Sequence, residues 1–182
     1  AGESVLVVGL GGVGLSVVQG ARLVGASEVI VVDPSPPKLE LARTMGATDV
    51  LEAGGALAKQ VRALTDGRGV DHAFDCVGLA QTIRDSWSST RRGGHTTIVG
   101  IGSKEQQVTF SALELFHFAR TLSGCVYGGA DPRVLMPRIL EHAAAGELDL
   151  AALISGTTDL DGIDKAFTDM EAGIGVRFLV VP

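Results

Sequence analysis

The most restrictive feature of the sequence is a glycine-rich turn between an apolar strand pattern and a helix pattern. The run Val5–Val8 is short, apolar and mostly β-branched, as expected for a strand that is buried on both faces. It leads into Gly9-Leu10-Gly11-Gly12-Val13-Gly14, and apolar residues at helical spacing then continue to Val24. This strand–turn–helix unit predicts an α/β fold, in which parallel strands alternate with helices.

The rest of the chain repeats this alternation. Further strands are expected at Val29–Val32, Asp49–Leu51, Val70–Phe74, His95–Val99, Leu122–Val126 and Val176–Val181. Helices with their caps are expected at Gly12–Val24, Ser35–Met45, Ala56–Leu64, Ala80–Ser88, Ser111–Ala119, Asp131–Ala145 and Asp161–Met170. Right-handed crossovers then give a doubly wound parallel six-stranded sheet, the Rossmann fold, with its ligand site at the carboxyl ends of the strands.

Composition excludes several other classes of protein. Hydrophobic residues make up 46% of the chain and charged residues 20%, which is enough apolar material for a folded core. The net charge of −6 gives no basic surface for nucleic acid or an anionic membrane. Two cysteines cannot form a disulfide framework, and neither a signal peptide nor a membrane-spanning run is recognisable. The expected location is therefore cytoplasmic.

The glycine spacing suggests a ligand for the turn. It matches Gly-x-Gly-x-x-Gly, which binds the pyrophosphate of dinucleotides when it lies between a strand and a helix. Gly9 permits the tight turn, Gly11 lets the backbone approach a pyrophosphate, and Gly14 lets the helix lie close to the sheet. The helix N-terminus adds free N–H groups and the positive end of its dipole.

Asp33 strengthens the dinucleotide prediction. It ends the second expected strand, 19 residues after Gly14, where an acid that binds the ribose is expected. A carboxylate at this position would accept hydrogen bonds from the adenosine ribose and repel a 2′-phosphate, which predicts NAD rather than NADP. A methyltransferase is a weaker alternative, because its glycine turn is usually led by an acid and spaced differently.

The composition changes once along the chain. After Gly146 the sequence becomes acidic and leaves the regular alternation of elements. Residues 1–146 are therefore expected to form the dinucleotide-binding domain, and residues 147–182 a short C-terminal appendage. The chain begins without methionine and enters a strand almost at once, so we expect a piece of a longer protein.

Longer stretches of the sequence carry a resemblance to a known family. They are Gly9–Leu15, Val31–Asp33, Lys38 with Ala42, Met45–Thr48, Gly69–Gly78, Gly93–Gly94, Val99–Gly100, Gly124–Gly129 and Phe167-x-x-Met170-x-x-Gly173. Together they resemble the coenzyme domain of medium-chain, zinc-dependent alcohol dehydrogenases, over essentially the whole chain. The glycine turn is similar to that of the classical and class III-like branch.

The resemblance implies cofactor-binding roles for particular residues. In the turn these are Gly9, Gly11, Gly12, Val13 and Gly14, with Val13 packed against the nicotinamide ring. On the adenosine side, Asp33 would hold the ribose, Lys38 would add a contact, and Val77 and Gly78 would line the cleft.

The remaining implied contacts lie on the nicotinamide side. The main chain at Val99, Cys125 and Tyr127 would hold the carboxamide of the ring, and Arg177 would reach the pyrophosphate. Catalysis in the family needs a zinc ion held by Cys and His ligands of an N-terminal domain, which precedes the part matched by this chain. Cys76, Cys125 and the four histidines have no metal-ligand spacing, so no catalytic or metal residue is predicted here.

The resemblance thus implies the NAD(H)-binding part of an oxidoreductase that interconverts small alcohols and aldehydes, with zinc only in the parent enzyme and no turnover by this chain alone. Two alternatives stay open: a stand-alone, non-catalytic dinucleotide-binding module, and a zinc-free NAD(P)H quinone or enoyl reductase of the same superfamily. The strand at Leu122–Val126 is expected at the edge of the sheet, where the family pairs with a second copy, so a homodimer is also predicted.

Overall fold

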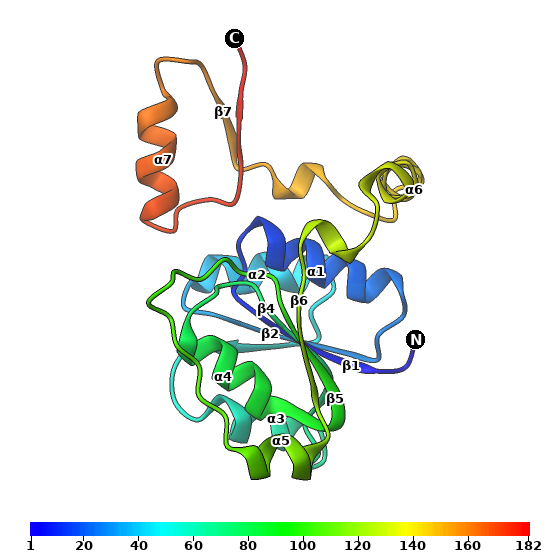
Figure 1. Cartoon of the computed structure of the whole chain (residues 1–182). Coiled ribbons are helices and arrows are strands. Elements are labelled where there is room, and N and C mark those ends of the chain that lie inside the picture. The colour runs from blue at the N-terminus through cyan, green and yellow to red at the C-terminus, as the bar shows by residue number, and fades with distance from the viewer.

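The computed structural model describes residues 1–182 and contains a six-stranded parallel sheet (Figure 1). Its strands are β1 (Ser4–Val8), β2 (Glu28–Asp33), β3 (Asp49–Glu52), β4 (Val70–Asp75), β5 (Thr90–Ile98) and β6 (Thr121–Gly124). They lie in the order β3-β2-β1-β4-β5-β6. The direction of winding therefore reverses between β1 and β4, and the predicted doubly wound Rossmann sheet is confirmed.

The chain has seven α-helices, and five of them cover the two faces of this sheet. The seven are α1 (Gly12–Leu23), α2 (Pro36–Met45), α3 (Leu57–Leu64), α4 (Ala80–Ser89), α5 (Ala112–Phe118), α6 (Pro132–Ala144) and α7 (Ile163–Glu171). Helices α1 and α2 lie on one face, and α3, α4 and α5 lie on the other (Figure 1). None of the seven has the combination of length and hydropathy that crossing a membrane would require.

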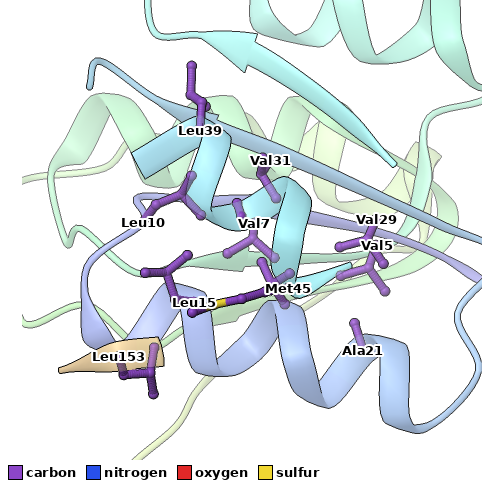
Figure 2. Packing of buried hydrophobic residues seen from close by; sticks show 12 residues of the cluster. Val5, Val7, Leu10, Leu15, Ala21, Val29, Val31, Leu39, Met45 and Leu153 are labelled. Atoms are coloured by element: carbon purple, nitrogen blue, oxygen red, sulfur yellow. The ribbon is translucent and has the colours of Figure 1, made fainter. Parts of the chain in front are cut away.

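The central strand β1 contributes to both layers of the core. Val5 and Val7 point to the side of α1 and α2, where Leu15 and Met45 belong to the same buried cluster (Figure 2). Leu6 and Val8 point to the opposite side and pack with residues of α3. All five residues of β1 are buried, which explains why Val5–Val8 is apolar throughout rather than alternating.

The C-terminal segment forms a small unit of its own beyond α6. Strands β7 (Gly156–Thr158) and β8 (Phe178–Val180) pair in parallel and are joined through α7. This unit lies on the α1 side of the main sheet (Figure 1). Leu153, in the short helix η2 (Ala151–Leu153), is only 1% exposed and belongs to the cluster under α1 (Figure 2). The backbone of Asp149 is also tied to the Gln19 side chain of α1 by two hydrogen bonds, of 3.0 and 2.7 Å.

The seven expected helices and seven expected strands all occur, with differences at their ends. Strand β5 begins at Thr90 rather than His95, because the polar Arg91–Gly94 stretch continues the strand through an irregularity in its pairing with β4. Strand β6 ends at Gly124, and β8 is shorter than expected. Strand β7 was not expected, because its three residues are too few to show a periodic pattern.

Leu153→Ala should destabilise the chain by about 2–5 kcal/mol, because it leaves a cavity where the C-terminal segment enters the core. Leu150→Ala is the matched control: Leu150 lies three residues earlier and is 44% exposed, so its loss should cost less than about 1 kcal/mol. Urea unfolding of both variants measures the difference. Equal effects would mean that Leu153 does not anchor this segment.

Candidate functional site

A cleft of about 580 Å³ lies at the carboxyl ends of β1 and β2. Four of the predicted cofactor-binding residues line it, namely Gly9, Asp33, Lys38 and Val77. The other lining residues are Val8, Val32, Pro34, Ser35, Ala53, Leu79, Thr82, Ala172 and Gly173. The cleft therefore lies at the reversal point of the sheet, where open α/β folds bind their ligands.

The glycine turn is shaped by close backbone contacts. Gly9 has a φ of +90°, and a Cβ added there would lie 2.5 Å from a methyl carbon of Val77. A Cβ added to Gly14 would lie 1.8 Å from the carbonyl oxygen of Gly9, so the first turn of α1 lies directly on the turn. Gly11 is different, because a Cβ there would meet nothing within 4 Å. The turn is thus closed where it packs on the sheet and open at Gly11, where a ligand could approach.

The N-terminus of α1 is available to an anion. Its N-cap is Gly11, which has no side chain to bond the free N–H groups of the first turn. Arg177 comes from just before β8 and lies over this helix end, with Nη2 3.5 Å from the carbonyl oxygen of Gly12. The side chain of Arg177 is exposed. N–H groups, a helix dipole and a guanidinium therefore meet at one point, which suits a phosphate or pyrophosphate.

Asp33 ends β2 beside the glycine turn. Its side chain is 7% exposed, and its two oxygens accept hydrogen bonds from the N–H groups of Leu10, at 2.7 Å, and Ser35, at 2.9 Å. A carboxylate has about four acceptor positions, so these bonds fix its orientation and leave capacity for further donors. Asp33 lines the cleft, and such donors can therefore be the hydroxyl groups of a ligand.

The loops after β4 and β5 touch through their backbones. Gly78 has a φ of +88°, and a Cβ on Gly100 would lie 2.4 Å from the backbone nitrogen of Gly78. The N–H of Gly78 also donates to the carboxylate of Asp75, at 2.8 Å. Asp75 was not among the predicted residues, although its place at the end of a buried strand could have indicated it. It positions the loop that carries Val77 and Gly78.

Asp75 is fully buried, and one of its oxygens, Oδ1, has no hydrogen-bond partner. Burial raises the pKa of this carboxyl group above its ordinary value, and the hydrogen bond from the N–H of Gly78 opposes the rise.

The other predicted residues lie at the same edge of the sheet but outside the cleft. The N–H groups of Val99 and Cys125 donate to the carbonyl oxygens of Asp75 and Ile98, at 2.8 and 2.9 Å, and are therefore already used. The side chains of Val13 and Tyr127 are 48% and 82% exposed. The lining residues Ala53, Leu79, Thr82, Ala172 and Gly173 were missed, because small or apolar loop residues have no local signal for binding.

The cysteines do not form a metal site in this chain. Burial is the main reason that the pKa of the Cys76 thiol rises to about 12, with smaller contributions from Asp75 and Cys125. Across residues 1–182, no three His, Cys, Asp or Glu side chains are grouped so that they could hold a metal ion.

Comparison of the sequence with known proteins finds a dehydrogenase family and individual dehydrogenases. The sequence profile of the family described as zinc-binding dehydrogenase matches residues 12–142. The chain is 36% identical over 182 residues to an S-(hydroxymethyl)glutathione dehydrogenase of Synechocystis sp.. It is 35% identical to the protein of the same name from Photobacterium damsela. Each alignment covers 98% of this chain and 49% of the relative, so the chain spans about half the length of these proteins.

Solved structures agree with the sequence comparison. An alcohol dehydrogenase zinc-binding domain protein from Burkholderia ambifaria superimposes with a TM-score of 0.94 and 28% identity, over 100% of this chain and 49% of that chain. Benzyl alcohol dehydrogenase from Acinetobacter calcoaceticus superimposes with a TM-score of 0.92 and 26% identity, over 98% of this chain and 49% of that chain. The similarity again covers about half of each relative.

Gly14→Ala should destabilise the chain by at least about 2 kcal/mol, because its Cβ would overlap the carbonyl oxygen of Gly9. Gly20→Ala is the matched control in the same helix, since a Cβ there meets nothing within 4 Å. It should stabilise α1 by about 0.5–1 kcal/mol. Thermal unfolding of the two variants should therefore shift in opposite directions. A stabilised Gly14→Ala variant would contradict the close contact.

Proposed function

Because the chain belongs to the zinc-binding dehydrogenase family, we propose that it is the coenzyme-binding half of an NAD-dependent alcohol dehydrogenase. The observation that carries the proposal is the cleft lined by Gly9 of the glycine turn and by the buried Asp33, beside the uncapped N-terminus of α1. NAD, when bound, would supply the nicotinamide carbon that accepts or returns a hydride. The residues of this chain would bind and orient the coenzyme.

The residues present fit the parts of a dinucleotide. The open face of Gly11 and the free N–H groups of α1 suit the pyrophosphate, with Arg177 placed to add charge-assisted hydrogen bonds. Asp33 would accept bonds from the ribose hydroxyls, and Lys38 lines the same part of the cleft. Val77 and Gly78 would border the adenosine, in a loop held by Asp75.

We assign the nicotinamide to the ends of β5 and β6, where Val13, Val99, Cys125 and Tyr127 would surround it. Because the N–H groups of Val99 and Cys125 are already bonded within the sheet, the carbonyl groups of these two residues would be their contacts to the carboxamide. This side of the coenzyme would face the second half of the parent protein.

The alcohol or aldehyde that exchanges hydride with the coenzyme would be bound by that second half. Relatives named for S-(hydroxymethyl)glutathione and benzyl alcohol suggest an alcohol or aldehyde as the substrate of the parent enzyme. We place the zinc ligands there as well, because residues 1–182 offer no group of metal-binding side chains. This chain alone should then bind coenzyme without turnover.

The coenzyme proposal is tested by titrating the chain with NADH and NADPH and following nicotinamide fluorescence. NADPH should bind at least about tenfold more weakly, because its 2′-phosphate would meet the carboxylate of Asp33. Asp33→Asn should weaken the binding of NADH and bring the affinities for NADH and NADPH closer together. Glu52→Gln is the matched control, since it removes a carboxylate from the paired position at the end of β3. It should leave the ratio of affinities within about twofold.

Three results would contradict parts of this proposal. Similar affinities of the unmodified chain for NADH and NADPH would remove Asp33 from the ribose site. Failure to bind either coenzyme would contradict the proposal that this chain binds coenzyme without the second half. Turnover of an alcohol by the chain alone would contradict the assignment of catalysis to the missing half.

We also propose that two copies pair through the edge strand β6. All four residues of β6 are exposed, and its outer edge has no neighbouring strand. Leu122 is 40% exposed and Val126 is 78% exposed beside this edge. Unpaired backbone groups next to apolar side chains favour strand addition across a twofold axis.

Light scattering at tens of micromolar should therefore give the mass of a dimer. Leu122→Lys should shift the chain towards monomer, because an edge lysine opposes strand pairing. Leu150→Lys, at a similarly exposed leucine outside the sheet, should leave the dimer unchanged. A monomeric unmodified chain would contradict the proposed pairing.

A further inference from the structure

A second cavity, of about 440 Å³, contains an unusual concentration of positive charge. Five of the chain's 15 lysines and arginines line it, whereas the chain as a whole has a net charge of −6. The lining residues are Arg62, Gly67, Arg68, Arg91, Arg92, Phe118 and Arg120. No acidic side chain lines this cavity, which we call the arginine cavity.

The arginine cavity lies at the opposite edge of the sheet from the coenzyme cleft. Arg68 comes just before β4, Arg91 and Arg92 lie at the beginning of β5, and Arg120 comes directly before β6. Because β4, β5 and β6 are parallel neighbours, these three positions meet at the amino ends of the strands. The proposed coenzyme contacts all lie at or near the carboxyl ends, so the two sites are distinct.

Most of the charge in the arginine cavity is not neutralised by the protein. Arg91 pairs with Asp71, with 2.5 Å between Nε and Oδ1, and the other four arginines have no ion-pair partner. Burial lowers the pKa of Arg120 to about 10, and the nearby positive charge of Arg62 acts in the same direction. Arg120 nevertheless stays protonated at neutral pH. Like charges so close together cost free energy unless an anion offsets them.

Contacts within the protein hold several of these side chains in place. Arg62 donates to the carbonyl oxygen of Ser88 at 2.7 Å, and Arg92 donates to that of His117 at 2.8 Å. Both acceptors lie in the last turns of helices, where cations are favourable. Arg120 lies 4.3 Å from the ring centroid of Phe118. Each guanidinium has five donors, so these bonds orient the groups and leave donors free.

No contact within the protein explains the position of the Arg68 side chain. This side chain is exposed, lines the cavity, and makes neither a hydrogen bond nor an ion pair. Helix capping therefore accounts for Arg62 and Arg92 but not for the whole cluster.

We propose that the arginine cavity binds a small anion with two or more linked phosphoryl groups. Guanidinium groups match phosphate oxygens in geometry as well as charge, and several arginines together favour a multivalent ligand over a single phosphate. The volume falls within the roughly 300–1,000 Å³ of small-molecule pockets. Nucleic acid fits less well, because the positive charge is confined to one cavity of an acidic chain.

Calorimetric titration of the full chain with inorganic tripolyphosphate, at fixed ionic strength, tests this proposal. Arg68→Glu should weaken binding by about tenfold or more, and Arg68→Gln by a smaller factor, because Arg68 has only the ligand as a partner. Neither variant should lower the unfolding temperature appreciably. Arg138→Gln, at an exposed arginine of α6, changes the net charge by the same amount as Arg68→Gln and should leave affinity within about twofold.

Arg177→Gln distinguishes binding in the arginine cavity from binding at the glycine turn, which also suits linked phosphates. If tripolyphosphate occupies the arginine cavity, this variant should retain the binding that Arg68→Glu loses. Loss of binding in Arg177→Gln with full binding in Arg68→Glu would place the anion at the glycine turn and overturn the proposal. Absence of binding, or equal weakening in all variants including Arg138→Gln, would overturn it too. The same titration with a nucleoside triphosphate tells whether an organic group adds affinity.

Discussion

Burial of β1 on both of its faces is the constraint on which the rest of the structure depends. Val5 and Val7 pack beneath α1 and α2, whereas Leu6 and Val8 pack against the layer that contains α3. A shift of one residue in this strand would exchange the two faces and break both clusters. The position of β1 between β2 and β4 then brings the ends of all three strands to one edge.

The coenzyme cleft follows from that arrangement and from a few close backbone contacts. The turn after β1 lies against the start of α1 at Gly14 and against the loop after β4 at Gly9. Asp33 bonds the turn from the neighbouring strand, so its carboxylate is oriented before any ligand arrives. The chain belongs to the zinc-binding dehydrogenase family and matches about half of each known relative, which supports the proposal that a second half of a parent protein binds the substrate.

The two edges of the sheet would differ in how they attract anions. At the carboxyl edge, backbone N–H groups and the end of α1 would attract phosphate, with one exposed arginine, Arg177, nearby. At the amino edge, the attraction would come from side chains alone, because five guanidiniums gather where three parallel strands begin. The first arrangement depends mainly on one local motif, whereas the second combines residues from separate helices and strands.

The sequence by itself determined the seven helices, the six strands of the parallel sheet and the position of the glycine turn, because these depend on local periodicity and on glycine and cap residues. It also indicated Asp33, since the length of one helix fixes its spacing from Gly14. Only the tertiary structure decided that Arg177 reaches Gly12 across 165 residues, that Asp75 supports Gly78, and that five arginines share one cavity. Those contacts depend on how distant segments pack, and packing leaves no periodic signal in the chain.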